Sequence, residues 1–127
     1  MTRAKTPKIS EAEWIVMEVV WCKHPVTALE VVRQLAAHKQ WQDQTIRTML
    51  RRLIRKKALT YKAEGKVYYY SPAVSREQCV RGESRSFLER VFGGNAHPLL
   101  VQLAQETKLS AKEIAELKRI LQDKEGK

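Results

Sequence analysis

The chain has 127 residues, of which 43% are hydrophobic and 30% are charged, so it has room for one compact domain or two small modules. This length excludes a multidomain enzyme. Its 24 Lys and Arg residues exceed its 14 Asp and Glu residues and leave a formal charge of +10, which indicates a polyanionic partner, first of all nucleic acid.

Helix starts are marked by the pattern Ser/Thr-x-x-Glu/Gln, in which two side chains pair with backbone N–H groups that the first helical turn leaves without partners. It marks four predicted starts: Ser10 with Glu13, Thr27 with Glu30, Ser75 with Gln78, and Ser110 with Glu113. The first pair predicts a helix to about Trp21, and the second predicts a helix that ends near His38. The apolar residues expected to share one side of the second helix are Leu29, Val32, Leu35 and Ala36.

The segment from Asp43 to Lys57 has the pattern of a helix that packs on one side and is free on the other. Its apolar residues recur at the spacing of one buried stripe: Ile46, Met49, Leu50, Leu53 and Ile54. Hydrogen-bonding side chains lie opposite this stripe or on its flanks, at about 100° per residue.

Four of these polar side chains are expected to read bases in the major groove of DNA: Gln44, Arg47, Thr48 and Arg51. Arg can pair bidentately with guanine, Gln can pair with adenine, and Thr can contact a thymine methyl group, so the residue types suit this task. Thr45 and Arg55 are expected to contact phosphates.

A β-hairpin is predicted directly after this helix. β-Branched and aromatic residues at 59–63 and 67–71 flank a glycine turn at 64–66. An isolated hairpin is only marginally stable, so we expect it to lie against the helices, with Lys66 at its tip and Lys62 on its flank to meet phosphates. Three helices followed by a basic hairpin predict a winged helix-turn-helix, which is a mainly α fold with a small β-hairpin.

The charge balance divides the chain near residue 74. Residues 1–74 hold 14 basic and 6 acidic side chains, a balance of +8, whereas residues 75–127 hold 10 and 8. We predict a winged-helix DNA-binding domain at 1–74 and a helical dimerisation region at 75–127, because so short a C-terminal region cannot bury a sufficient core alone. The residues expected at the dimer interface are Phe87, Val91, Leu99, Leu100, Leu103, Ile114, Leu117 and Leu121. A symmetric homodimer would match a palindromic operator in double-stranded DNA.

Several blocks of the sequence resemble the penicillinase-repressor family, the BlaI/MecI group. They are Ile9-Ser10-Glu11-Ala12-Glu13-Trp14, then Met17, Val20-Trp21 and Trp41, then Thr45-Ile46-Arg47-Thr48-Met49-Leu50-Arg51-Arg52-Leu53, Lys57-Ala58-Leu59 and Glu64-Gly65-Lys66-Val67-Tyr68. The resemblance covers nearly the whole chain. It implies a homodimeric bacterial repressor that binds an inverted-repeat operator through an N-terminal winged helix and dimerises through C-terminal helices.

The resemblance also implies a route of inactivation. In this family a membrane-bound sensor protease triggers cleavage within the C-terminal region, after which the dimer separates. Alignment by Leu109-Ser110 puts the cleavage position at Gln102 and Leu103, where staphylococcal members have an Asn-Phe pair. A second branch of the family senses copper through a cysteine cluster near the C-terminus. The last cysteine here is Cys79, so copper sensing by that device is not expected.

The main alternative is a nucleic-acid-binding or architectural protein, RNA-binding proteins included, that uses the same basic surface without reading sequence. The mixed Gln, Thr and Arg face argues against it, because a purely electrostatic binder would carry Lys throughout. A winged helix that serves as a protein-interaction module is a third hypothesis, and it predicts little affinity for any duplex at moderate salt. An enzyme is not expected, because the sequence has no nucleophile elbow, no phosphate-binding glycine loop and no paired-His metal helix.

No metal, cofactor or small-molecule substrate is expected. Cys22, His24 and Cys79 are too few for structural zinc, which normally needs four ligands in tight pairs. Two distant cysteines indicate a reduced compartment, and the polar, basic N-terminus fits neither a signal peptide nor a membrane span, so we predict a soluble cytoplasmic protein. The N-terminal cations form either a disordered tail or an arm that contacts phosphates: Arg3, Lys5 and Lys8.

Overall fold

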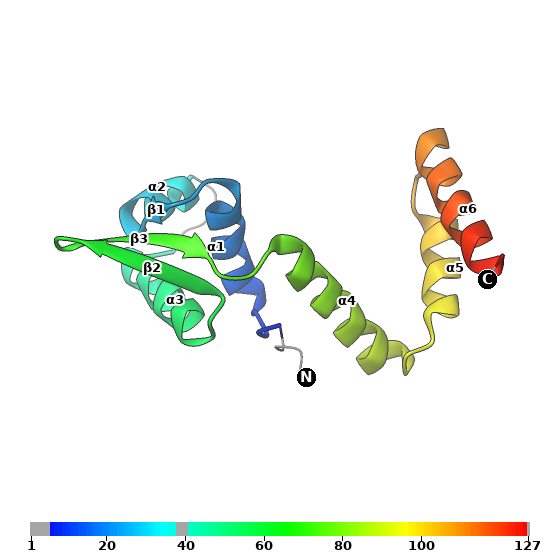
Figure 1. Ribbon diagram of the computed structural model, residues 1–127, viewed down its shortest axis with the longest axis horizontal. Helices are drawn as coiled ribbons and strands as arrows, with labels where there is room; N and C mark the ends of the chain where they lie inside the picture. The colour runs from blue at the N-terminus through cyan, green and yellow to red at the C-terminus, as the bar shows by residue number, and fades with distance from the viewer. Residues whose placement is uncertain (1–5, 38–40, 127) are drawn as a thin grey trace. The chain divides into compact units, whose positions relative to one another are not determined.

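A computed structural model describes residues 6–37 and 41–126, and the chain divides into two compact units, 1–84 and 85–127. In its described residues the first unit contains three helices, a three-stranded sheet and the beginning of a fourth helix (Figure 1). The elements are α1 Glu11–Cys22, β1 Val26–Thr27, α2 Ala28–Ala36, α3 Asp43–Arg55, β2 Leu59–Glu64, β3 Val67–Pro72 and α4 Arg76–Phe92. His38, near which the second helix was predicted to end, lies outside the described residues. Among the helices described, none is long and apolar enough to cross a membrane.

The predicted helix starts of the first unit are confirmed, and each is closed by a reciprocal pair of hydrogen bonds. At α1, the Glu13 N–H donates to Ser10 Oγ (3.1 Å) and the Ser10 N–H donates to Glu13 Oε1 (3.0 Å). The same kind of pair closes α2 and the start of α4. Because each pair satisfies two backbone donors that have no partner inside the helix, the caps define where these helices begin.

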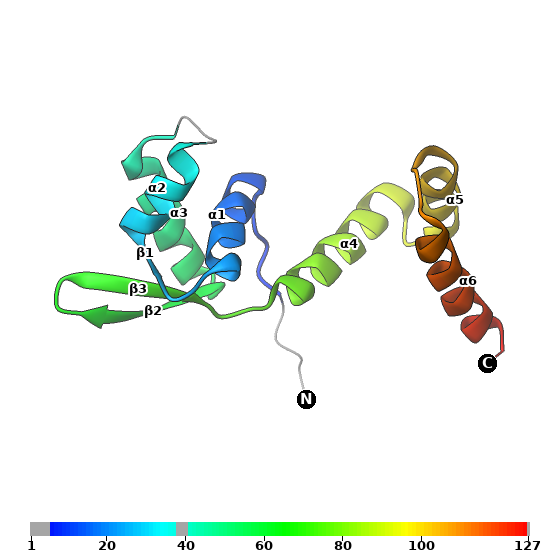
Figure 2. The ribbon, with the colours of Figure 1, turned by 90° about the horizontal axis from the view of Figure 1, so that it is seen from above.

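The predicted hairpin forms, but the prediction of two strands is incomplete, because the sheet has three antiparallel strands in the order β1-β3-β2. A two-residue strand such as β1 shows no alternation by which the sequence could reveal it. The hairpin turn is Gly65-Lys66, and Gly65 has a φ of +66°, which glycine adopts without steric cost. Figure 2 shows α1, α2 and α3 on one side of the β2–β3 hairpin, whose turn extends past them. We call this hairpin the wing.

The apolar stripe of α3 packs into the core, as predicted. Ile46, Met49, Leu50 and Leu53 are each at most 4% exposed, and they belong to one buried cluster with Met17 of α1. Full burial of a side chain of this size stabilises the fold by about 1.5–3 kcal/mol. Burial of the stripe therefore fixes the rotation of α3 about its axis and turns its opposite side outward.

The predicted apolar side of α2 is only partly correct, because Val32 and Leu35 pack in or against the core but Leu29 and Ala36 do not. Val31 and Leu35 are buried, whereas Leu29 is 46% exposed and Ala36 is also exposed. A second stripe with helical spacing begins at Ala28, one residue earlier, and it is this stripe that packs against the core. The sequence alone does not decide between two overlapping stripes, because both satisfy the helical period.

The beginning of α4 is packed into the first unit. Cys79 is 2% exposed within the core cluster, and Arg76 donates two hydrogen bonds to Glu18, of 2.8 and 3.2 Å. The compact unit accordingly extends to Ser84, further along the chain than the predicted boundary after residue 74.

The second unit contains the rest of α4, followed by α5 (Ala96–Glu106) and α6 (Ala111–Glu125). Gly93 and Gly94 follow α4 with φ of +59° and +87°, and the predicted Ser-Glu cap forms at α6. The helix expected around 99–104 is longer than predicted at both ends. None of the described residues from 85 to 126 is buried, so a single copy of this unit has no hydrophobic core.

Candidate nucleic-acid interface

The outward side of α3 carries most of the side chains predicted to contact DNA. We define this outer face by Gln44, Thr45, Arg47, Thr48, Arg51 and Arg55. All are exposed except Thr48, which is half-buried. At about 100° per residue, Gln44, Arg51 and Arg55 lie along the centre of the face. By the same geometry Arg47 lies on one flank and Thr45 on the other.

Two of the predicted base readers are joined by a hydrogen bond. The Nη2 group of Arg51 donates to Oγ1 of Thr48, at 3.1 Å. This bond restricts a long, flexible side chain before any ligand is present, so it lowers the entropy that Arg51 loses on binding.

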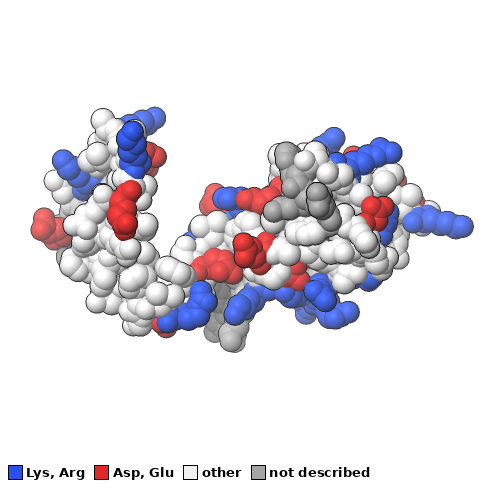
Figure 3. All heavy atoms as spheres, turned by 180° about the vertical axis from the view of Figure 1, so that it is seen from behind, with Lys and Arg blue, Asp and Glu red and all other residues white. Residues whose placement is uncertain are grey.

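In the part of the chain that the structure describes, the basic side chains of α3 and the wing that were predicted to contact DNA form no salt bridge. Within residues 6–37 and 41–126, the salt bridges are Lys56 to Glu13, Arg76 to Glu18, and Arg81 to Glu77. The cations outside these pairs include Arg47, Arg51, Arg55, Lys62 and Lys66. Their charges are available to an external polyanion. Figure 3 shows Lys and Arg atoms gathered along the lower edge of the first unit and projecting from its right-hand end.

Lys56 belongs to the same basic run but serves the fold. Its Nζ lies 2.5 Å from Glu13 Oε1 and 2.9 Å from the carbonyl oxygen of Lys8, so it ties the end of α3 to the start of α1. Burial raises the pKa of Glu13, but the hydrogen bonds from Lys56 and Ser10, together with the charge of Lys56, lower it by more. The pKa of Glu13 therefore lies below its ordinary value, and the carboxylate stays charged at neutral pH.

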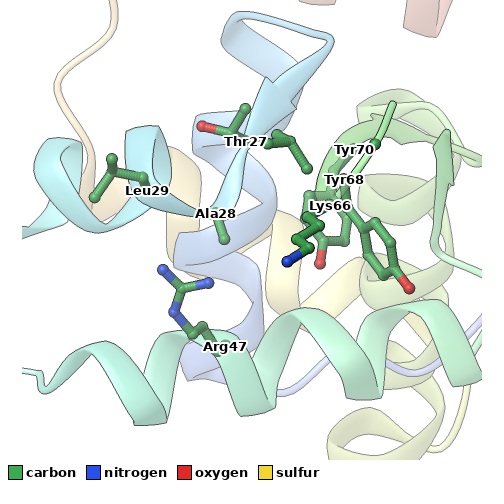
Figure 4. Close-up of a pocket in the computed structure, with 9 residues that line it drawn as sticks. Thr27, Ala28, Leu29, Arg47, Lys66, Tyr68 and Tyr70 are labelled. Carbon is green, nitrogen blue, oxygen red and sulfur yellow. The ribbon is translucent and has the colours of Figure 1, made fainter. Parts of the chain in front are cut away.

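A hollow of 640 Å³ opens between α2, α3 and the wing. We call it the wing hollow, and it is lined by Thr27, Ala28, Leu29, Arg47, Gly65, Lys66, Val67, Tyr68 and Tyr70. In Figure 4 the guanidinium group of Arg47 and the ammonium group of Lys66 both point into it. No lining residue is acidic. Burial raises the pKa of the Tyr70 hydroxyl, although the nearby charge of Arg47 acts in the opposite direction.

A second, smaller hollow of 320 Å³ borders α3. It is lined by Ala12, Trp41, Gln44, Thr45, Thr48, Met49 and Arg52. The structure thus brings Gln44, Thr45 and Thr48 together and separates them from Arg47, which lines the wing hollow. Arg52, which the sequence did not single out as a DNA contact, is exposed beside this group.

The two wing lysines lie at different places. Lys62 pairs with Tyr69, and the neighbouring pair in the ladder contains Tyr70. Because successive residues of a strand face opposite sides of the sheet, Lys62 lies on the side of the wing away from Tyr70 and the wing hollow. Lys66 is in the turn, as predicted.

Of the residues that line the wing hollow, only Arg47 and Lys66 were predicted as part of a site. The unpredicted residues include three large apolar side chains that are 44–46% exposed: Leu29, Val67 and Tyr68. Their only signal in the sequence is apolar character on a helix or strand, and a core position gives the same signal.

The residues predicted at a dimer interface lie open in the second unit. Seven of them are 40–56% exposed: Phe87, Val91, Leu100, Leu103, Ile114, Leu117 and Leu121. Leu99 is half-buried. Gln102 and Leu103, the predicted cleavage position, are exposed within α5. The chain therefore carries apolar surface for which the second unit offers no cover.

The remaining candidates do not gather into a site. Across the described residues there is no group of three or more potential metal ligands. Cys22 is exposed, Cys79 is buried, and His24 Nδ1 lies 2.9 Å from the carbonyl oxygen of Val20. Arg3 and Lys5 of the predicted tail or arm lie outside the described residues.

Comparison with known proteins matches residues 9–123 to the penicillinase repressor family. The penicillinase repressors of Bacillus licheniformis and Staphylococcus aureus are both 37% identical over 94% of this chain, which aligns with 93% and 94% of those proteins. The methicillin resistance regulatory protein MecI of Staphylococcus aureus is 32% identical over 94% of this chain and 98% of that protein.

Two solved structures are each similar to more than half of the chain. The solution structure of the DNA-binding domain of the repressor BlaI is 39% identical, with a TM-score of 0.54, over 60% of this chain and 93% of that one. The monomeric form of Bacillus licheniformis BlaI, solved in complex with the blaP half-operator, is 40% identical, with a TM-score of 0.52, over 58% of this chain and 90% of that one.

Proposed function

The chain belongs to the penicillinase repressor family, and from this premise we propose that it represses transcription by binding an inverted-repeat operator in double-stranded DNA. The observation that carries the proposal is the outer face of α3, which is exposed, rich in hydrogen-bonding groups and free of salt bridges among the described residues. The major groove is about 12 Å wide and admits a helix that presents such a face. Since repressors of this kind act on the chromosome, we place the protein in the cytoplasm.

Base reading is assigned to three side chains at the centre of the outer face and beside it: Gln44, Thr48 and Arg51. Each can pair with a base edge, and their mixture of donors and acceptors can distinguish one sequence from another. Thr45, Arg55 and Lys62 are assigned to phosphates, which fix the register of the helix in the groove. The half-operator bound by the BlaI relative supports a duplex as the partner.

The repressor acts as a homodimer in this proposal. The exposed apolar residues of α5 and α6 support a partner subunit, because a soluble monomer rarely leaves so much apolar surface open. A two-fold dimer presents two copies of α3 to two half-sites of a palindrome, and the bound dimer occludes the promoter.

Release of the operator by proteolysis belongs to the same proposal, with a membrane-bound sensor protease as the partner that triggers cleavage between Gln102 and Leu103. Cleavage there would cut α5 and separate α6 from the rest of the chain, and both helices carry apolar residues that we assign to the dimer interface. Mass spectrometry of the protein from induced cells tests it. A fragment that ends at Gln102 is expected, and a chain that stays intact while the genes are expressed rules this route out.

Selection of duplexes from a random pool by the full chain, at about 150 mM salt, tests the proposed function. We expect recovery of a palindrome with two half-sites. A protein that binds all duplexes alike would yield no enriched sequence, and this result would favour the non-specific alternative over a repressor. Failure to retain any duplex would point to a protein-interaction module.

A further inference from the structure

We infer that the wing hollow holds one sugar–phosphate segment of an operator strand, with Arg47 and Lys66 on its phosphate. The inference rests on the proposed function and gives Arg47 a different task from the base reading predicted for it. Arg47 then fixes where the protein sits on the duplex, while the centre of the outer face determines which sequence it prefers.

The charges of the hollow suit a single anionic group. Arg47 reaches it from α3 and Lys66 from the turn of the wing, and their cationic groups point into the same space (Figure 4). Neither forms a salt bridge with a described residue. Two cations that converge without an acidic neighbour repel each other, and an anion between them removes this cost.

The apolar part of the lining indicates which anion. Leu29, Val67 and Tyr68 line the same hollow and are about half exposed. A free inorganic anion would leave them in water, whereas a nucleic-acid strand places an apolar deoxyribose face beside each phosphate. Burial of such faces against the three side chains removes apolar surface from water and favours binding.

The position of Arg47 on α3 also separates it from the base readers. At about 100° per residue, it lies roughly 60° from Gln44, on the flank toward the wing, whereas Thr48 lies on the other flank. A helix whose central residues enter the major groove brings its flanks to the two backbones that border the groove. The flank toward the wing therefore faces a strand, with the wing turn beyond it.

Methylphosphonate scanning of a selected operator duplex tests the inference in the full-length protein. Each substitution neutralises one phosphate, and binding is measured for wild type, Arg47→Ala, Lys66→Ala and the double variant. Each single variant should weaken binding by about 10- to 100-fold on the operator and on its mismatched versions alike. At one phosphate, neutralisation should weaken the wild type strongly and the variants little further.

Two control variants separate the roles. Lys23→Ala removes an exposed cation outside the hollow. It should remain as sensitive as the wild type to neutralisation of the phosphate that Arg47 and Lys66 contact. Arg51→Ala should change the base preference instead. Relaxed selectivity at one base pair in Arg47→Ala would overturn the inference. It would also be overturned if the losses from the substitutions and from phosphate neutralisation were additive at every phosphate.

A small ligand is the competing occupant. Sodium benzoate combines an apolar ring with a carboxylate, and at equal ionic strength it should displace the duplex no better than sodium chloride does. Stronger displacement from wild type than from Arg47→Ala would overturn the inference in favour of a small aromatic anion. If the wild type binds all duplexes equally, the repressor proposal fails, yet a shared phosphate position would still support the hollow as a backbone site.

Discussion

Glu13 is a buried carboxylate of α1 that helps to hold α3 in place. It closes the cap of its own helix with Ser10 and accepts a hydrogen bond from Lys56, directly after the last residue of α3. A buried carboxylate is tolerated only when it is paired and hydrogen-bonded, so this cluster connects the capping of α1 with the position of the DNA-facing helix.

Replacement of Glu13 by Gln should destabilise the first unit by about 1–3 kcal/mol at pH 7, because the amide keeps a hydrogen bond to the Ser10 N–H but loses the charge opposite Lys56. The pKa of Glu13 is lowered in the folded state, so its contribution is complete above the ordinary carboxyl value and disappears as the pH falls through the lowered value. Urea unfolding of both proteins should show the difference at pH 7 and a smaller one near pH 3.

Glu11→Gln provides the matched control, because Glu11 is an exposed acid in the same first turn. It should change stability by less than about 0.5 kcal/mol. A loss for Glu13→Gln that is independent of pH would contradict the assigned charge pair.

At the scale of elements, the beginning of α4 is part of the winged-helix unit. Cys79 packs in the core, Arg76 pairs with Glu18, and Trp21 Nε1 donates to the carbonyl oxygen of Val74 at 3.0 Å. Removal of Cys79 with the beginning of α4 would open the core cluster that also supports α1, and a cavity of this kind costs stability.

The stability of a truncated winged-helix fragment should therefore depend on whether it includes the beginning of α4. A chain that ends at Ser84 should unfold at clearly higher urea concentration than one that ends at Val74, with a difference of about 2–4 kcal/mol from the lost packing of Cys79. Equilibrium unfolding followed by circular dichroism measures this. Equal stability of the two fragments would show that α4 contributes nothing to the first unit.

The sequence predicts elements well where a local signal is unambiguous. The Ser-Glu and Ser-Gln caps mark helix starts, and the stripe from Ile46 to Leu53 predicts which side of α3 packs and which side is free. The prediction is only partly correct for α2, where stripes beginning at Ala28 and Leu29 overlap, and it misses β1, which has only two residues.

The wing hollow was not predictable, because it depends on tertiary contacts. Leu29, Arg47 and Lys66 come from three elements, and nothing local in the sequence indicates that their side chains converge. Helical phase alone placed Arg47 on a flank of the outer face. The wing, which forms the hollow beside this flank, packs next to α3 only in the folded chain.

At the scale of the whole molecule, the second unit lacks a hydrophobic core in a single chain. No described residue of 85–126 is buried, although α5 and α6 carry apolar residues at helical spacing. In the dimer that we propose, these residues supply the core that is missing from each copy.

Leu117→Glu combined with Leu121→Glu should convert the dimer into a monomer, because two buried charges without partners would oppose association. Light scattering should give the wild type about twice the chain mass of 14.7 kDa, and the variant that mass alone. Lys118→Glu, an exposed change on the same helix, should leave the dimer intact. A wild type that is monomeric at micromolar concentration would contradict the account of this unit.

The central claim is that the outer face of α3 reads the sequence of a duplex, and repeating the random-pool selection with two variants tests it most directly. Arg51→Ala should recover the wild-type palindrome with one position in each half-site relaxed, since it removes a base contact that contributes about 1–3 kcal/mol of discrimination. Lys62→Ala should recover the same palindrome unchanged, with weaker binding overall. An unaltered motif from Arg51→Ala, or the same relaxation in both variants, would contradict the claim.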